Sequence, residues 1–250
     1  MQCSPSVDVP SRFPHERESS PQIEEVDTLL VSDVHLGTEL SRSAALLATL
    51  RRYTFRRLIL LGDILDDVNF ARLSRPHWDL LAYIRTLSTA ERHIEVVWVA
   101  GNHDQLLSRL THNFLGLHVH TRYRWSYEGK SFLAMHGHQF DAFIARHPLI
   151  TDTASFLYYT LQRWERDHHR LSRFLKRTSK TWLQMSELVA QKAAAYAAQR
   201  GADGIFCGHT HLPLCRRFGD VLYHNTGCWT ERPATFITIG AGGIQLQECP

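Results

Sequence analysis

Short apolar runs recur along the chain, and most of them end at a polar residue. Short apolar runs bounded by turn-forming residues are typical of strands buried in a sheet. The folded part is expected to begin near Val26. The predicted strands cover residues 28–31, 58–61, 96–100, 132–135, 204–207, 221–223 and 234–239.

Apolar residues with the three-to-four-residue spacing of amphipathic helices lie between the first strands. One helix is predicted over residues 41–53, with Ser41 or Ser43 as its N-terminal cap. A second begins at Pro76, because proline is favoured in the first turn of a helix. Its apolar face is expected to comprise Trp78, Leu81, Ile84 and Leu87.

The rhythm changes in the second half of the chain. From about residue 148 to 200 there is no strand signal, and residues 153–167 and 179–200 have helical character. The later helix is expected to end at Gly201, since glycine is common just past a helix C-terminus. The alternation of strands and helices therefore predicts an α/β domain that acquires a helical segment before its last strands.

Composition bounds the class of protein. A chain of 250 residues suits one large domain, here residues 23–250, and residues 1–22 are rich in Ser, Pro and charge, which predicts a flexible arm. Five cysteines in no recognisable disulfide or zinc spacing favour a reducing compartment. No apolar run approaches the ~18 residues of a membrane-spanning helix, and no signal peptide is recognisable, so a cytoplasmic location is expected.

Five polar stretches follow predicted strands and contain residues that can bind metals. Sites in α/β folds form beyond the carboxyl ends of strands, so these stretches are expected to meet at one edge. Carboxylate, imidazole and amide ligands around two nearby cations are the equipment of two-metal hydrolysis. The stretches are Asp33-Val34-His35, Gly62-Asp63-Ile64-Leu65-Asp66, Gly101-Asn102-His103-Asp104, His136-Gly137-His138 and Gly208-His209-Thr210-His211.

Each stretch taken alone has an ordinary structural explanation. Asp33 could cap a helix, Asp63 and Asp66 could be turn residues, and Asn102 suits a left-handed turn. His136 could be a hydrogen-bonded core histidine. Five such stretches in succession, each after a strand, favour the metal site over five separate coincidences.

These blocks, in this order over residues 33–211, resemble the calcineurin-like metallophosphoesterase superfamily. The resemblance implies an α/β (α+β) fold, a four-layer αββα sandwich with a helical cap inserted at about residues 141–200. It also implies two divalent metal ions. Mn²⁺ is the expected ion, and Fe, Zn, Ni or Co are the alternatives. The metal ligands implied are Asp33, His35, Asp63, Asn102, His136, His209 and His211.

The resemblance assigns roles within this set. Asp33, His35 and His211 are expected at the first metal, and Asp63 is expected to bridge the two. The resemblance places Asn102, His136 and His209 at the second metal. The expected catalytic residues are His103, which contacts the phosphate or protonates the leaving group, and Asp104, which orients the His103 ring. Asp66 and His138 are expected to lie behind or beside the ligands.

The predicted insertion suggests the substrate. Basic residues, among them Arg163, Arg166 and Arg170, alternate there with aromatic and aliphatic residues, a combination that suits an anionic amphiphile or the cytoplasmic face of a membrane. An amphipathic helical pair with a solvated basic face is the structural alternative. In this insertion and in residues 32–37, 136–141, 203–213 and 223–229, the chain resembles the UDP-2,3-diacylglucosamine hydrolase branch, bacterial enzymes that release UMP from a nucleotide lipid.

Two residues depart from the pattern of that branch. Its best-known members have Arg at the position of His103, and its relatives often have Asp at the position of Cys228. The alternatives are a phosphodiesterase or phosphatase for soluble phosphoesters, and a non-catalytic scaffold on the same fold. A net charge of +3 identifies no partner, and no nucleic-acid ligand is expected.

Overall fold

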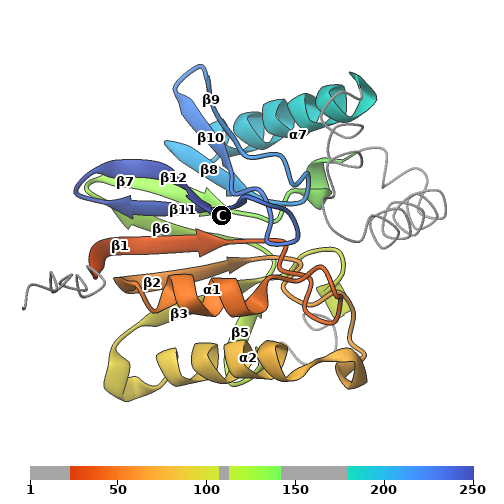
Figure 1. The fold of residues 1–250 in the computed structure, drawn as a ribbon. Helices are drawn as coiled ribbons and strands as arrows, with labels where there is room; N and C mark the ends of the chain where they lie inside the picture. The colour runs from red at the N-terminus through yellow and green to blue at the C-terminus, as the bar shows by residue number, and fades with distance from the viewer. Residues whose placement is uncertain (1–22, 107–112, 142–179) are drawn as a thin grey trace, which may run out of the picture.

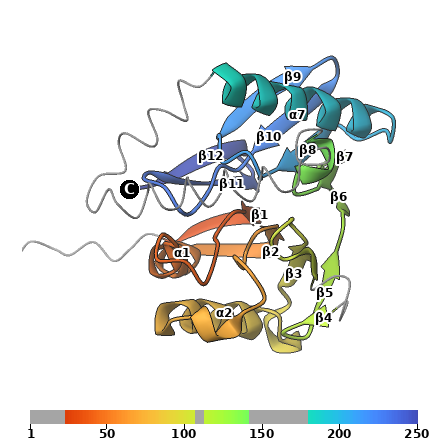
Figure 2. The same ribbon diagram turned by 90° about the vertical axis from the view of Figure 1, so that its right-hand side faces the viewer.

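The computed structural model describes residues 23–106, 113–141 and 180–250. Two β-sheets lie face to face, and helices cover the two outer faces (Figures 1 and 2). The predicted arm at residues 1–22 lies outside the described residues. So does most of the predicted insertion, including Arg163, Arg166 and Arg170.

The first sheet has seven strands in the order β12-β11-β1-β2-β3-β5-β4. Neighbouring strands β1, β2, β3 and β5 are parallel, and β11 pairs with β1 in the antiparallel sense. The strands are β1 (Glu24–Val31), β2 (Tyr53–Leu61), β3 (Glu95–Val99), β4 (Asn113–Phe114), β5 (Leu117–His120), β11 (Ala234–Gly240) and β12 (Gly243–Cys249).

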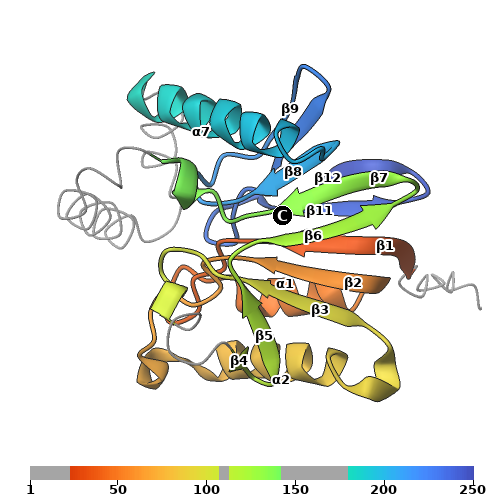
Figure 3. The same cartoon turned by 180° about the vertical axis from the view of Figure 1, so that it is seen from behind.

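The second sheet has five strands in the order β6-β7-β8-β10-β9. Its three central strands are parallel, and an antiparallel strand closes each edge. Figure 3, seen from behind, shows the hairpin of β6 and β7 in front of the first sheet. The strands are β6 (Tyr123–Tyr127), β7 (Lys130–Ala134), β8 (Gly204–Cys207), β9 (Leu214–Phe218) and β10 (Val221–Asn225).

Helices form the two outer layers. α1 (Ser43–Leu50) and α2 (Arg75–Leu87) pack on the first sheet, and α7 (Lys180–Ala198) packs on the second. The C-terminal part of the predicted insertion is thus an outer layer of the sandwich. Three short 3₁₀ helices complete the described elements: η1 (Phe70–Arg72), η2 (Ala90–Arg92) and η3 (His138–Phe140).

Alternation along the strands distributes apolar side chains among three cores. In β1, Leu29 and Val31 pack toward α1 and α2, whereas Leu30 packs between the sheets against residues such as Phe206. A third core lies under α7, where buried alanines allow the helix to approach the sheet closely. Three cores between four layers confirm the αββα sandwich that the family resemblance implies.

Two expectations about the helices are wrong. The N-cap of α1 is Arg42, and no side chain caps this end, so neither Ser41 nor Ser43 serves as the predicted cap. Trp78 does not belong to the buried face of α2, because it is 44% exposed. It lies beside the exposed ring of Phe70, with ring centroids 6.5 Å apart.

Among the described residues, the structure contains no helix long and apolar enough to cross a membrane. The polar stretches lie at the carboxyl ends of the strands. β2 and β8 end directly before one of these stretches, β1, β3 and β7 end one residue earlier, and β10 ends directly before Thr226.

Candidate metal centre

Two contacts join the ends of the two sheets. Nε2 of His136, which follows β7, lies 3.2 Å from Oδ2 of Asp63, which follows β2. Nε2 of His211, beyond β8, lies 3.0 Å from Oδ1 of Asp33, beyond β1. The convergence predicted from the sequence is therefore present, and it lies at the seam between the sheets.

The first group of potential ligands is Asp33, His35 and His211, whose ligand atoms lie within 4.8 Å of one another. Nε2 of His35 is 3.4 Å from Nε2 of His211 and 4.0 Å from Oδ1 of Asp33. Asp33 and His35 are buried, and His211 is largely buried. Three donor atoms converging in this way fit one divalent cation.

A second group, Asp33, Asp63 and His136, also has its ligand atoms within 4.8 Å of one another, and all three residues are buried. Asp33 belongs to both groups, whereas the sequence predicts Asp63 as the bridging carboxylate. Oδ1 of Asp63 accepts a hydrogen bond from the backbone N–H of His103 at 2.9 Å. Oδ2 faces His136, so the two oxygens of Asp63 point to different partners.

The donor set fits metal ions. Oδ1 of Asn102 is buried and has no hydrogen-bond partner among the described residues. A buried amide oxygen left without a donor costs free energy unless something else binds it, and a cation does so. Nδ1 of His136 lies 3.0 Å from the carbonyl oxygen of Leu61. Because a carbonyl only accepts, Nδ1 carries the proton and Nε2 keeps its lone pair for a metal.

The charges at the centre attract cations. Burial alone would raise the pKa of Asp33, but the positive charges of His211 and His136 outweigh it and lower that pKa to about 2. Burial would likewise lower the pKa of His136, yet the charges of Asp63 and Asp33 raise it to about 10. The pKa of Asp63 is also held well below its usual value, against the effect of burial, by His136 and His103. Buried carboxylates that stay ionised need positive charge beside them, from protons or from metal ions.

The backbone at the predicted ligands is unusual. Of the described residues other than glycine, eight have positive φ, and five of these are predicted ligands. Left-handed backbone costs a residue with a side chain roughly 1–2 kcal/mol, and such outliers concentrate at functional sites. The five are Asp33 (φ 52°), His35 (49°), Asp63 (50°), His209 (67°) and His211 (55°).

Two glycines allow the close approach of the loops. A Cβ at Gly101 would overlap Oδ1 and the backbone nitrogen of Asp63. A Cβ at Gly208 would overlap the side chains of Asp33 and Ser32. Glycine at position 101 therefore lets the third polar stretch lie against Asp63, and glycine at position 208 lets the fifth stretch lie against Asp33.

The expectation that Asp104 orients the His103 ring is wrong. Asp104 is buried and accepts hydrogen bonds from the backbone N–H of Ile64 and Gly101 and from Nε1 of Trp98. Nδ1 of His103 instead donates to the backbone carbonyl of Asp66 at 2.8 Å. Asp104 thus ties the loop after β3 to the loop after β2.

Asp66 lies against His35, where the sequence predicts a supporting residue. Its Oδ1 accepts a hydrogen bond from Nδ1 of His35 at 3.3 Å, which leaves Nε2 of His35 toward Asp33 and His211. His138 also lies where predicted, beside the ligands, with its ring centroid 5.5 Å from His136 and 6.3 Å from His209. Burial, followed by the positive charge of His136, lowers the pKa of His138 to about 3.

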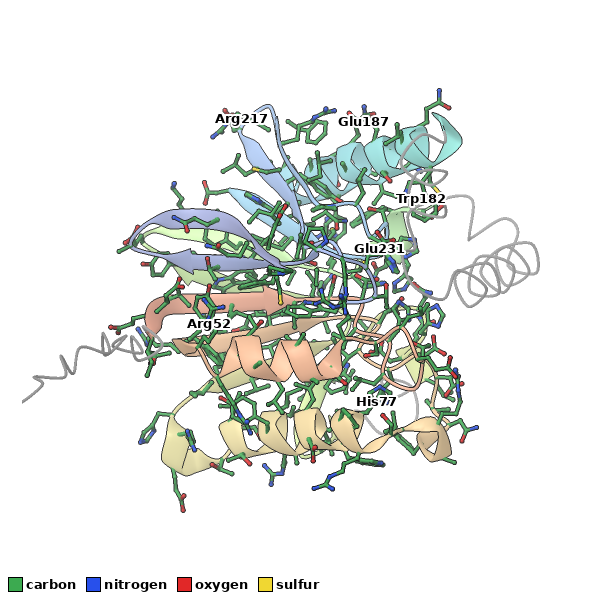
Figure 4. The ribbon with its side chains drawn as sticks, in the orientation of Figure 1. Arg52, His77, Trp182, Glu187, Arg217 and Glu231 are labelled. Carbon is green, nitrogen blue, oxygen red and sulfur yellow. The ribbon has the colours of Figure 1, made fainter. Side chains whose placement is uncertain are left out.

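The sequence predicts no role for three neighbours of the site. Oδ2 of the buried Asp141 lies 3.1 Å from Nε2 of His209. Cys228 and Glu231 form another group of potential ligands with His211 (Glu231 is labelled in Figure 4), and Asp66 and His103 form one with His35. The signal for Asp141 was its position five residues after His136, and the signal for Cys228 was its departure from the family pattern.

Comparison with known proteins gives a family. The sequence profile of the calcineurin-like phosphoesterase superfamily domain matches residues 27–241, which is most of the chain. No curated protein sequence matches the chain.

Solved structures show distant likenesses. A phosphoesterase, YfcE from E. coli, has 15% identity and a TM-score of 0.46, covering 86% of this chain and 88% of its own. Vps29 from Entamoeba histolytica, solved with Zn²⁺, has 16% identity and a TM-score of 0.45, covering 88% and 97%. A predicted phosphoesterase from Streptococcus pneumoniae has 16% identity and a TM-score of 0.39, covering 89% and 97%. The profile match, and not these likenesses, carries the assignment to a family.

Proposed function

The chain belongs to the calcineurin-like phosphoesterase superfamily, and from this membership we propose that it cleaves the pyrophosphate of a UDP-sugar lipid resembling UDP-2,3-diacylglucosamine. At the level of the family it is a metal-dependent phosphoesterase. The observation that carries hydrolysis at this site is the pair of ligand groups that share Asp33 where the two sheets meet. Water would add to phosphorus, the bridging P–O bond would break, and UMP and a lipid phosphate would leave.

The residues divide the work between binding ions and handling the substrate. Asp33, His35 and His211 would hold one divalent ion. Asp63, Asn102, His136 and His209 would hold the other, and one of the two aspartates, Asp33 or Asp63, would bind both ions. Bound ions of this kind supply Lewis acidity and lower the pKa of the attacking water. Mn²⁺ is the ion we propose, although oxygen and nitrogen donors also suit Fe, Zn, Ni or Co.

His103 is placed to act on the substrate. Because its Nδ1–H is donated to the carbonyl oxygen of Asp66, the other nitrogen, Nε2, is the one that can hold a proton for the leaving oxygen. The side chain is 28% exposed, in contrast to the buried ligands, so a substrate can reach it. The ring stands edge-on to His35, with centroids 4.9 Å apart, which keeps it beside the first group of ligands.

Exposed apolar side chains that follow site residues along the chain support an amphiphilic substrate. Val68 and Phe70 follow Asp66, and Leu106 follows Asp104; with Trp78 they are among the large apolar residues left exposed. Exposed apolar side chains near a polar site are typical of surfaces that bind ligands or membranes. We further propose that the protein works at the cytoplasmic face of a membrane and that Arg163, Arg166 and Arg170 bind the anionic part of the lipid.

A parallel assay tests the substrate. Protein loaded with Mn²⁺ is incubated with UDP-2,3-diacylglucosamine in mixed micelles, with bis-p-nitrophenyl phosphate and with cyclic nucleotides, and the Asp63→Ala variant serves as the inactive control. UMP release that exceeds turnover of the small diesters is expected. Good turnover of small diesters without UMP release would refute the lipid substrate. It would favour a soluble phosphoester, the alternative that fits His103 standing where the best-known lipid hydrolases have Arg.

A further inference from the structure

Asp141, which lies five residues after the predicted ligand His136, contacts another predicted metal ligand, His209. Its Oδ2 lies 3.1 Å from Nε2 of His209, and Asp141 is only 3% exposed. A carboxylate facing a ring nitrogen accepts that nitrogen's proton in a hydrogen bond. Nε2 of His209 is therefore the protonated nitrogen, and Nδ1 has the lone pair.

This arrangement is the reverse of that at two other histidines of the site. His35 and His136 both donate through Nδ1, to Asp66 and to the carbonyl of Leu61, which leaves Nε2 for a metal. His209 donates through Nε2. Since a neutral imidazole binds a metal through its unprotonated nitrogen, His209 should bind through the nitrogen nearer its backbone.

The position of the His209 backbone agrees with this choice. Its N–H lies 3.1 Å from Oδ2 and 3.3 Å from Oδ1 of Asp33, so the main chain itself reaches the centre. Nδ1 is closer to the main chain than Nε2, and it suits a ligand whose backbone already lies against the carboxylate. Two residues later, His211 presents Nε2 to the same aspartate.

Contacts with η3 and α7 fix the position of Asp141. η3 ends directly before it, and the Asp141 N–H donates to the carbonyl of His138 at 3.1 Å. Phe140 packs edge-on against Tyr196 of α7, with ring centroids 5.5 Å apart, and its carbonyl lies 3.4 Å from Nζ of Lys192. Helix α7 thereby anchors the turn that presents Asp141 to His209.

We propose that Asp141 is a positioning residue that holds the Nε2–H tautomer of His209 and so makes Nδ1 the atom that binds the second metal. The proposal rests on the two-metal site of the proposed function. Partners of this kind behind a ligating histidine are worth roughly 10- to 100-fold in metal affinity.

Spectroscopy of the unmutated protein tests the tautomer directly. The protein is loaded with Zn²⁺, which is diamagnetic, and long-range ¹H–¹⁵N spectra are recorded, with the His209 signals identified by their absence from His209→Gln. A proton on Nε2 and a metal-shifted Nδ1 are expected. A proton on Nδ1 with the metal at Nε2 would overturn the proposal, whatever the protein hydrolyses.

Titration of the metal-free protein with Zn²⁺ provides the second test. Asp141→Ala should bind the second equivalent 10- to 100-fold more weakly while keeping the first, and Asp141→Asn, which retains an accepting oxygen, should fall between. Asp79→Ala, which removes an exposed carboxylate on α2, is the matched control. Two equivalents bound by Asp141→Ala with unchanged affinity would refute the role. If Asp141→Ala does not fold, Asp141→Asn and the spectra decide. Absence of all phosphoesterase activity in unmutated protein would instead count against the proposed function.

Discussion

Replacing His224 with phenylalanine should make the folded protein more resistant to unfolding by acid. His224 lies in β10, is 4% exposed, and stacks on Phe206 with ring centroids 5.0 Å apart and an interplanar angle of 12°. Its Nε2 is buried and has no hydrogen-bond partner among the described residues. Burial lowers the pKa of His224 from 6.5 to about 4, because the charged ring would be taken out of water without a partner.

The sign and the size of the effect are set by this pKa. Below pH 6.5 the unfolded chain binds a proton at His224 while the folded protein does not, so acid favours unfolding until the pH falls through about 4. At 1.36 kcal/mol for each pKa unit, the loss is about 3 kcal/mol when complete and about 2.5 kcal/mol near pH 4.5. Phenylalanine does not titrate, and a planar apolar ring can retain the stacking on Phe206.

Urea unfolding of metal-free protein at about pH 7.5 and pH 4.5 measures the effect, since removing the metals first excludes their dissociation from the comparison. Relative to the unmutated protein, His224→Phe should gain about 2.5 kcal/mol between the two pH values. His224→Asn, which is polar but does not titrate, should show the same relative gain even if its stability at neutral pH is lower. Parallel pH dependence in all three proteins would refute the reasoning.

Three further predictions concern the candidate metal centre. Asp63→Ala should abolish metal loading and hydrolysis, as measured by elemental analysis and by diester turnover; retention of two metal equivalents would contradict its role. His103→Ala should keep both metals and lose roughly 10²- to 10⁴-fold in kcat, and an emptied site would instead make His103 a ligand. Gly208→Ala should cost roughly 1–3 kcal/mol in urea unfolding, because its Cβ would overlap Asp33 and Ser32. Gly242→Ala is the control, since a Cβ there meets only the flexible side chain of Gln245.

The sequence predicts the central strands well because they are buried on both faces. β1, β2, β3 and β8 contain continuous apolar runs whose ends coincide with polar residues, and a short run of this kind is typical of a buried strand. The strands missed by sequence reasoning lie nearer the sheet edges. β12, for example, contains only exposed and half-buried residues, so its local composition does not predict a strand. It is a strand because it pairs with β11.

The site was predictable as a set of residues but less so as a set of contacts. Ligand types and their order along the chain are local information, and the structure brings Asp33, Asp63 and His136 together as expected. The partners of histidines depend on which backbone carbonyl or carboxylate the packing brings near. Asp66 rather than Asp104 holds His103, because the three donors around Asp104 engage both of its oxygens.

Backbone conformation explains how the centre keeps its shape. Five ligand positions with left-handed backbone would together cost roughly 5–10 kcal/mol, which is comparable to the net stability of a domain. Hydrogen bonds between the loops oppose this cost: the Asp33 N–H donates to the carbonyl of Gly62 at 3.0 Å, and the His35 N–H donates to the carbonyl of Asp63 at 3.0 Å. Nδ2 of Asn225, at the end of β10, donates to the carbonyl of Gly208 at 2.6 Å. Because these bonds join the loops of neighbouring strands within each sheet, the fold itself helps to hold the ligands in place.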